Sequence, residues 1–362
     1  MKKVKSKKKR VFIIISCVLI LLLGGWGLLA VNIYNSNFNK RFKSYEPLML
    51  HVEDFEGLQR TKYEFSSDKG QMLTGYMYSA GDNQCGIIVI AHGFGGGGHN
   101  SYMDCANYFA RHGYYVFAYD ATGNDESEGA GVGGIPQGVI DLDYAISFLE
   151  KSGKFPALPI SLFGHSWGGY SVCSVLTYHP EIKAVIEISG CNRSSDLFEA
   201  SGKREAGKII YTMMPFIKFY ELIKYGKYAR NTAMDGFKTS KAAVMIVHSA
   251  DDNIVPASYG YDLYYNKYNN NPRFTFIRFE NKGHNEIFTD INDTYLNEFN
   301  TGFNKWTETL NYDYKADANK AQFAADKAKY INDNLDRTRW CGRLDEKLFK
   351  RFLNFYDEHV RR

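Results

Sequence analysis

Apolar and polar positions divide the chain into an N-terminal apolar run and a long region of short apolar segments alternating with helical patterns. Residues 11–31 form 21 consecutive positions without a charged side chain. At 1.5 Å per residue this run can cross the roughly 30 Å hydrocarbon core of a bilayer. Residues 32–58 are polar and rich in asparagine, so we expect a juxtamembrane spacer there. No second run of this kind follows, and the pattern predicts one membrane span.

From residue 59 onward the pattern predicts strands and helices in alternation. Two apolar segments separated by a turn at 68–70 indicate a β-hairpin. Further segments rich in β-branched or aromatic residues indicate buried strands, and helical periodicity lies between several of them. The expected strands are 61–65, 71–78, 86–91, 114–119, 160–163, 184–188, 243–247 and 274–279, and the expected helices are 102–111, 139–150, 167–177 and 345–360. Such alternation predicts the α/β class, with a mostly parallel sheet covered by helices on both faces.

Two insertions interrupt this alternation. Residues 191–240 lie between two expected strands, and large apolar side chains recur at near-helical spacing in their middle. Met213, Phe216 and Tyr220 are candidates for lining an apolar substrate pocket, although a helix pair packed on the sheet edge would show the same pattern. The second insertion, residues 290–340, is rich in Asn, Tyr, Asp and Lys and receives no functional assignment.

Net charge is informative only at the N-terminus. The chain has 44 basic and 40 acidic residues, a net charge of +4. Seven of the positive charges lie in residues 1–10, so the remaining 352 residues hold 37 basic and 40 acidic side chains, a net of −3. The folded region is therefore slightly acidic, which argues against a nucleic-acid partner.

The basic tail predicts the topology. Because basic termini stay in the cytoplasm, we expect a single-pass protein of the cell membrane with residues 1–10 inside and everything beyond the span outside. A cleavable secretory signal is the alternative, but its apolar region is usually shorter, and Leu28 stands where a small residue is expected before cleavage. The cysteines show no C-x-x-C pair and no metal-like spacing with histidine, so neither a disulfide framework nor a metal site is expected.

Residues 164–168 read GHSWG, a G-x-S-x-G pentapeptide between an expected strand and an expected helix. In that context the glycines permit a sharp strand-to-helix turn, which lifts the Ser166 hydroxyl clear of the sheet. The Trp167 amide then opens the helix, where its N–H is free to stabilise an oxyanion. Ser166 is therefore the candidate nucleophile.

A serine nucleophile needs a base, and the base needs an orienting acid. His284 is the candidate base because it lies in a loop directly after the last expected strand, where the ligand-binding residues of such sheets collect. Asp251 and Asp252 follow the preceding strand and are both candidate acids, although either could instead cap the next helix. The order serine, aspartate, histidine along the chain is the one expected for an α/β-hydrolase.

With these residues in place, the sequence resembles the α/β-hydrolases over roughly residues 60–285 and the last helix. It is most similar to the membrane-associated serine hydrolases grouped with monoacylglycerol lipases and serine aminopeptidases. The resemblance implies that the H-G-x segment at 92–94 supplies a second oxyanion amide, that of Phe94. It also implies that residues 248–256, HSADDNIVP, match H-G-x-x-D-x-x-V-P, which selects Asp252, and that the insertion at 191–240 is a lid.

The sequence departs from the family pattern at two places. Ser249 replaces the glycine of the acid motif. Residues 120–129, DATGNDESEG, lack the arginine and one glycine of the family's D-x-R-G-x-G-x-S-x-G. These departures leave the candidate catalytic residues intact.

We therefore expect residues 59–362 to form a hydrolase domain that cleaves carboxylic esters, acyl or lipid-like, through an acyl-enzyme and without a cofactor. An amidase or aminopeptidase with the same triad is the alternative, and a non-catalytic scaffold is less favoured. Residues 93–98, GFGGGG, also match the dinucleotide motif G-x-G-x-x-G, with Asp120 as the ribose-binding acid. Four consecutive glycines satisfy that spacing almost automatically, and a dinucleotide site leaves Ser166, Asp252 and His284 unexplained.

Overall fold

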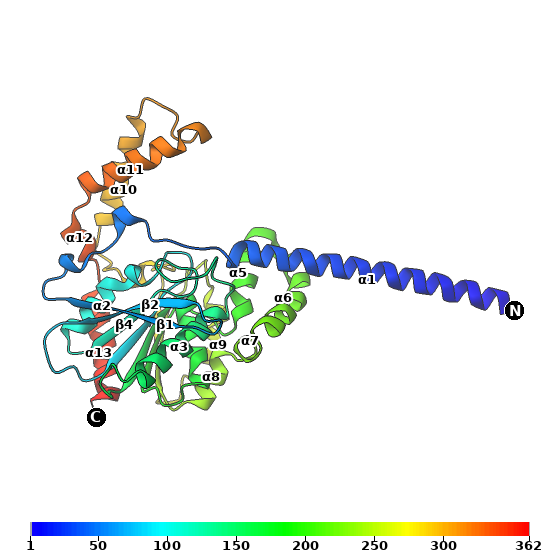
Figure 1. Cartoon of the computed structure of the whole chain (residues 1–362), viewed down its shortest axis with the longest axis horizontal. Coiled ribbons are helices and arrows are strands. Elements are labelled where there is room, and N and C mark those ends of the chain that lie inside the picture. The colour runs from blue at the N-terminus through cyan, green and yellow to red at the C-terminus, as the bar shows by residue number, and fades with distance from the viewer. Residues whose placement is uncertain (1, 362) are drawn as a thin grey trace.

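The computed structural model describes residues 2–361, with side chains from residue 9 onward. At its centre is an eight-stranded sheet in the order β1-β2-β4-β3-β5-β6-β7-β8 (Figure 1). The strands are β1 (Gln59–Ser66), β2 (Met72–Ser79), β3 (Ile87–Ala91), β4 (Tyr115–Tyr119), β5 (Ile160–His165), β6 (Ala184–Ile188), β7 (Ala243–Ser249) and β8 (Phe274–Phe279). The pairs β1–β2 and β2–β4 are antiparallel and all other pairs are parallel. The predicted hairpin and the predicted parallel sheet are both confirmed.

Helices cover both faces of the sheet because alternate residues of each strand point to opposite sides. In β3, every residue of which is buried, Ile87, Val89 and Ala91 join one core, whereas Ile88 and Ile90 join the other. The first core also contains α3 (Gln137–Lys151), α4 (Trp167–Ser174) and α9 (Tyr261–Tyr268). The second core contains α2 (Met103–Arg111) and α13 (Glu346–Val360). The expected helices 102–111 and 167–177 are thus confirmed, each with one part in a 3-10 turn, η3 (His99–Tyr102) or η4 (Val175–Thr177).

The two insertions are helical. The first contains α5 (Ser194–Ala206), α6 (Ile210–Tyr225), α7 (Lys227–Arg230) and α8 (Ala233–Thr239). The second contains α10 (Tyr295–Glu308), α11 (Lys320–Asn334) and α12 (Arg337–Cys341), and its helices project from the domain (Figure 1). Its base is held to the domain by Arg337, which pairs with Asp54, and by Trp340, whose Nε1 donates to the Leu48 carbonyl oxygen at 3.0 Å.

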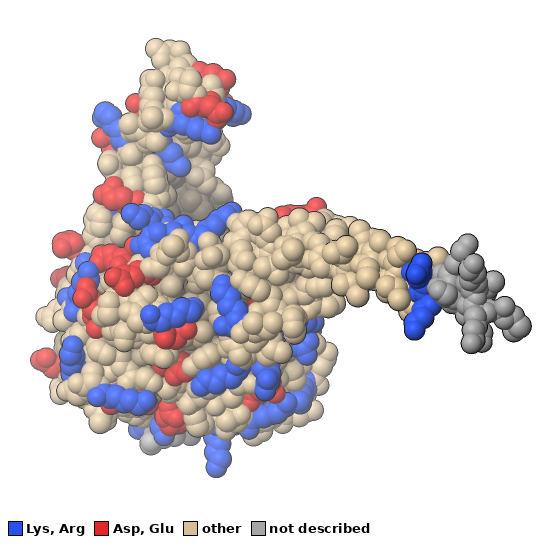
Figure 2. Space-filling model, turned by 45° about the vertical axis from the view of Figure 1, so that its right-hand side comes forward, with Lys and Arg blue, Asp and Glu red and all other residues tan. Residues whose placement is uncertain are grey.

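The N-terminal helix α1 (Lys2–Phe38) leaves the domain as a long rod (Figure 1). Its stretch Lys9–Phe38 is long and apolar enough to cross a membrane, as a membrane anchor or a signal sequence would be. In Figure 2 the rod is uncharged apart from basic residues at its far end. The side chains of the basic run at residues 2–8 lie outside the described part of the chain.

The part of the chain that follows the predicted span packs against the domain. Within α1, Ala30 and Tyr34 are 0% exposed and Phe38 is buried. Farther on, the buried side chains are Pro47, Leu50, Phe55 and Leu58. This differs from the spacer expected at residues 32–58. The few apolar residues of this segment pack against residues far away in the sequence. Its local composition did not indicate these contacts.

Candidate active site

Ser166 occupies the sharp turn between β5 and α4. Its backbone angles are φ 57° and ψ −115°, a conformation that L-residues adopt only under strain. The flanking glycines make the turn possible: a Cβ on Gly164 would lie 2.3 Å from the Gly168 carbonyl oxygen, and one on Gly168 would lie 1.9 Å from that of Ala91. The G-x-S-x-G pattern therefore reflects close backbone packing around the serine.

His284 and Asp252 lie next to Ser166. The loop after β8 brings His284 Nε2 to 2.9 Å from Ser166 Oγ, and His284 Nδ1 lies 2.7 Å from Asp252 Oδ2. Because an ionised carboxylate only accepts hydrogen bonds, Nδ1 carries the proton and the Nε2 lone pair faces the hydroxyl. The structure thus brings the three predicted residues into one hydrogen-bonded row.

The Asp252 carboxylate is fully buried and accepts several hydrogen bonds. Its Oδ1 accepts from the amides of Ile254 and Val255, both at 2.9 Å. Burial by itself raises the pKa of Asp252, but the hydrogen bonds from His248 and His284 outweigh it and hold that pKa well below its usual range. The carboxylate is therefore ionised wherever His284 is to act as a base.

His248 is a buried neighbour of Asp252. Its Nε2 lies 3.3 Å from Asp252 Oδ2 and 2.8 Å from the Val255 carbonyl oxygen. Burial lowers the pKa of His248, but Asp252 and Glu187 more than offset this and raise it. The i, i+4 spacing from Asp252 was the available signal, but a histidine ending a strand gives no indication of where its ring nitrogen points.

Asp251, the other candidate acid, connects two loops. Its Oδ1 accepts from the Gly283 amide at 2.9 Å and from the Ser249 hydroxyl at 2.6 Å. The same Ser249 hydroxyl accepts from the Lys282 amide at 2.9 Å. The serine that replaces the family's glycine therefore ties the acid loop to the loop of His284.

The predicted oxyanion residues Phe94 and Trp167 are neighbours, with ring centroids 5.6 Å apart. The Trp167 amide is the first of α4, and such amides have no partner within the helix. Directly after β3, His92 Nδ1 donates to the Gly93 carbonyl oxygen at 2.7 Å, and His92 Nε2 accepts from the Ala121 amide at 3.0 Å. This pair of bonds fixes the loop that carries Phe94.

A chain of hydrogen bonds connects this loop to the loop of His284. The Gly93 amide donates to the Tyr102 hydroxyl at 3.0 Å, and that hydroxyl lies 2.8 Å from His165 Nδ1. His165 Nε2 in turn lies 2.9 Å from the His284 carbonyl oxygen. Burial, together with the neighbouring His284 ring, lowers the pKa of His165 to about 3, so its ring is neutral. A neutral ring donates from Nε2 to the carbonyl and accepts the Tyr102 proton at Nδ1.

A cleft of about 400 Å³ opens above Ser166. Its walls include Phe94, Tyr102, Ile254 and Phe288, and among the described residues those that line it include no aspartate or glutamate. A second cavity of about 320 Å³ shares Gly96, Ser101 and Phe288 with it and continues toward Asp104, Trp340 and Arg343. The cleft thus extends toward the base of the second insertion.

The three lid candidates lie on α6 and face α1 instead of this cleft. Phe216 packs against Gly27, and the Tyr220 hydroxyl donates to Asn35 Oδ1 at 2.9 Å. Met213 lines a separate cavity between the lid and α1. A role for them in substrate binding stays a prediction.

The glycine-rich loop and Asp120 are held by bonds within the protein. Asp120 is 0% exposed, and its Oδ1 accepts from the His99 amide at 2.8 Å and faces His99 Nδ1 at 2.7 Å. The neighbouring acids are also paired: Asp125 with Ser44, Glu126 with Lys62, and Glu128 with the Met72 amide. A ribose-binding role for Asp120 would require its bonds to His99 to break. Glu126 and Glu128 are exposed to solvent, whereas Asp125 is half-buried.

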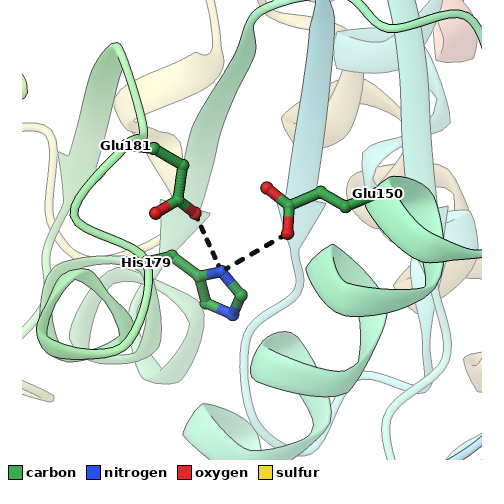
Figure 3. Close-up of side chains that lie close together, drawn as sticks. All are labelled: Glu150, His179 and Glu181. Atoms are coloured by element: carbon green, nitrogen blue, oxygen red, sulfur yellow. Dashed lines mark hydrogen bonds and ion pairs between the residues drawn. The ribbon is translucent and has the colours of Figure 1, made fainter.

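A second titratable cluster lies on another part of the domain. Glu150, His179 and Glu181 each offer a ligand atom within 4.8 Å of the others (Figure 3). The His179 nitrogens face Glu181 at 3.0 Å and Asp143 at 2.9 Å. Burial lowers the pKa of His179, but these carboxylates outweigh it and raise the pKa. The ring therefore donates protons from both nitrogens, which makes this cluster an ion-pair network.

Comparisons with known proteins support the same fold. Residues 82–234 match the family model described as serine aminopeptidase, S33. An esterase from Pyrococcus furiosus superposes with a TM-score of 0.53 at 15% identity, over 75% of this chain and 97% of the esterase. An acylaminoacyl peptidase from Pyrococcus horikoshii gives a TM-score of 0.52 at 14% identity, over 85% of this chain and 43% of the peptidase. No curated protein matches the chain. The protein is an α/β-hydrolase in fold, with a sequence similar to the serine aminopeptidase family over residues 82–234.

Proposed function

We propose that the protein is a serine hydrolase that cleaves carboxylic esters through an acyl-enzyme. The observation that carries this proposal is the row of hydrogen bonds from Ser166 through His284 to Asp252, located at the carboxyl ends of the parallel strands. In such a row the base activates the serine hydroxyl and the acid orients the base.

The mechanism follows from the orientation of each group. Ser166 Oγ attacks the substrate carbonyl carbon while His284 Nε2 takes its proton, and Asp252 stabilises the imidazolium that forms. The amides of Phe94 and Trp167 stabilise the oxyanion. His284 then gives the proton to the leaving alkoxide, which departs as an alcohol. Water, deprotonated by His284, attacks the acyl-enzyme, and Ser166 regains its proton as the carboxylic acid is released.

The apolar walls of the cleft favour a lipid-like ester. An aminopeptidase needs a carboxylate near the scissile bond to bind the substrate ammonium, and the described residues lining the Ser166 cleft supply none. Asp104, in the adjoining cavity, is the group on which the alternative amidase or aminopeptidase activity would depend. Asp104→Asn would abolish turnover of aminoacyl amides in that case and leave ester hydrolysis unchanged.

We also propose that α1 is an uncleaved membrane anchor. Cleavage after Ala30 as a secretory signal would remove Ala30 from the core and would break the contacts of Trp26 with Thr212 and of Gly27 with Phe216. This packing supports retention of the helix. The side of the membrane on which the domain lies rests on the basic tail alone, and protease accessibility of intact cells tests it.

The triad is tested by comparing Ser166→Ala with Ser101→Ala, a matched control because Ser101 lines the same cleft. We expect Ser166→Ala to lose most hydrolysis of p-nitrophenyl esters and all labelling by a fluorophosphonate probe, and Ser101→Ala to keep both. Full ester hydrolysis by Ser166→Ala would contradict the proposal.

A further inference from the structure

The anchor helix and the lid helix run side by side. Trp26 Nε1 donates to Thr212 Oγ1 at 3.1 Å, and a Cβ on Gly27 would lie 2.7 Å from a ring carbon of Phe216. Farther along, the Tyr34 hydroxyl donates to Glu221 Oε1 at 2.6 Å. Residue numbers increase together on α1 and α6, so the two helices are parallel. The beginning of α6 therefore lies beside the part of α1 that the sequence predicts to be within the bilayer.

The lid helix carries an exposed apolar stripe that continues the apolar surface of α1. Tyr211, Phe219, Leu222 and Ile223 recur at helical spacing and are exposed, with Phe219 at 64% and Ile223 at 69%. Lys208 and Lys218 are exposed on the same segment. Apolar side chains flanked by lysines are typical of helices that lie at a lipid surface. The outer face of α6 thus matches the boundary between acyl chains and headgroups.

An apolar cavity of about 210 Å³ lies between α1 and the lid. The side chains around it come from α1, α5, α6 and the turn between α5 and α6. The apolar ones are Ile33, Phe38, Phe198, Ala206, Ile209, Ile210 and Met213. The polar ones include Asn37 and Glu205, both exposed at the rim. Ile33 follows the end of the predicted span, Val31, by two residues, about 3 Å of helix. The cavity therefore begins where the hydrocarbon phase ends.

The inner end of the cavity is close to the Ser166 cleft. The Phe38 ring, which lines the cavity, lies 5.4 Å from the Phe94 ring, which lines the cleft. Phe94 is half-buried, and its ring and that of Phe38 lie between the two spaces. One aromatic contact therefore separates an apolar space at the membrane from the nucleophile.

We propose that this cavity binds an acyl chain of a membrane lipid ester, which enters from the bilayer between α1 and α6. The anchor helix then forms one wall of the substrate site in addition to holding the enzyme at the membrane. This inference rests on the proposed ester hydrolase activity and on α1 spanning the bilayer. The expected occupant is a single lipid chain, because the lining of the cavity is apolar and its opening adjoins the predicted span.

The first experiment narrows the cavity and compares short and long acyl chains. Ala206→Trp places an indole into the cavity from an exposed position, and Lys203→Trp places one on the same helix at a position that does not line it. With the full chain in phosphatidylcholine vesicles, we expect Ala206→Trp to lower kcat/KM for p-nitrophenyl palmitate by roughly tenfold or more, because several methylene groups lose an apolar site. Turnover of p-nitrophenyl acetate should be unchanged, and Lys203→Trp should affect neither substrate. Equal effects of Ala206→Trp on both esters, or no effect on either, would overturn the proposal.

The second experiment does not require catalysis. A fatty acid with a diazirine in its tail is incorporated into the same vesicles and photolysed, and the labelled peptides are identified by mass spectrometry. We expect labelling within residues 33–38 and 198–213 in the wild type and in Ser166→Ala, and its loss in Ala206→Trp. Labelling confined to the exposed part of α1, or labelling of these segments that Ala206→Trp leaves unchanged, would refute the site. If Ser166→Ala keeps full esterase activity while this labelling pattern holds, the proposed triad fails and the lipid site stands.

Discussion

Glu221 is a buried carboxyl group at the contact between α6 and α1, and its replacement by glutamine should stabilise the protein at alkaline pH. The side chain is 2% exposed and accepts hydrogen bonds from Tyr34 and Ser194, both at 2.6 Å. Burial raises the pKa of Glu221 from 4.5 to about 7, although these two hydrogen bonds lower it. The carboxyl group is therefore neutral in the folded protein over a range of pH in which it is ionised in the unfolded chain.

The sign of the effect follows from proton linkage. A group whose pKa is higher in the folded state contributes stability that is fully present below its unfolded pKa, here about 4.5, and lost as the pH rises through about 7. At 1.36 kcal/mol per pH unit the loss approaches roughly 3 kcal/mol above pH 7, an upper limit because water entry and local relaxation reduce it. Glutamine stays neutral at every pH, its Oε1 can accept from the Tyr34 hydroxyl, and its Nε2 can donate to Ser194 Oγ. Glu221→Gln should therefore match the wild type near pH 4.5 and exceed it at pH 8.

Thermal unfolding of the full chain in lipid nanodiscs measures this difference. We expect Glu221→Gln to raise Tm by about 5 °C at pH 8, with roughly 2 °C for each kcal/mol in a domain of this size, and to change it little at pH 4.5. Glu205→Gln, at an exposed position of the same lid, is the control and should leave Tm unchanged at both pH values. A wild type as stable as Glu221→Gln at pH 8, or a Tm difference that does not depend on pH, would refute the reasoning.

Three further predictions concern the triad, the ion-pair network and the second insertion. Asp252→Asn should lower kcat for ester hydrolysis by roughly 10³–10⁴-fold with little change in Tm, because the imidazole of His284 loses the acceptor that fixes its tautomer; a loss of less than tenfold would contradict this. His179→Phe should lower the free energy of unfolding by about 1–2 kcal/mol at pH 6 and by less at pH 9. A histidine whose pKa is raised in the folded state contributes stability that is present below about pH 6.5 and lost at higher pH. A larger loss at pH 9, measured by denaturant titration, would contradict the ion-pair network around His179. Arg337→Met should lower the free energy of unfolding by about 1–2 kcal/mol, because its charged hydrogen bonds to Asp54 are lost. Limited proteolysis should then cut the second insertion faster than in the wild type. An unchanged cleavage rate would show that other contacts hold the insertion to the domain.

The sheet could be predicted from the sequence because its parallel strands are buried on both faces. Segments 86–91 and 243–247 are nearly continuous apolar runs, and the structure has the fully buried strands β3 and β7 there. The order of the strands could not be predicted, because an apolar run indicates that a strand is buried but does not indicate which strands pair with it. The end of α1 was also missed, because apolar content falls after Val31 although the helix continues to Phe38.

The core of the candidate site could be predicted because the chemistry restricts both residue type and position in the fold. A serine between a strand and a helix, and a histidine after the last strand, are local patterns, and the structure places them 2.9 Å apart. The supporting contacts are not local. The Tyr102 hydroxyl joins Gly93 to His165. In the sequence, Tyr102 is recognisable only as the first residue of an amphipathic helix. Side-chain geometry of that kind leaves no periodic signal.

Two departures from expectation meet at one contact between segments far apart in the sequence. The loop at 120–129 lacks the arginine found in related sequences, and residues 32–58 pack on the domain instead of forming a spacer. Arg41, from that segment, donates to the carbonyl oxygens of Asp125 and Gly129, each at 2.7 Å, and so supplies the guanidinium that the loop itself lacks. The Asp125 carboxylate accepts in return from the Ser44 amide at 2.5 Å and from the Gly98 amide of the glycine-rich loop at 2.7 Å. These bonds hold the segment that follows α1 against the loop at 120–129, and the polar composition of residues 32–58 gave no indication of such long-range partners.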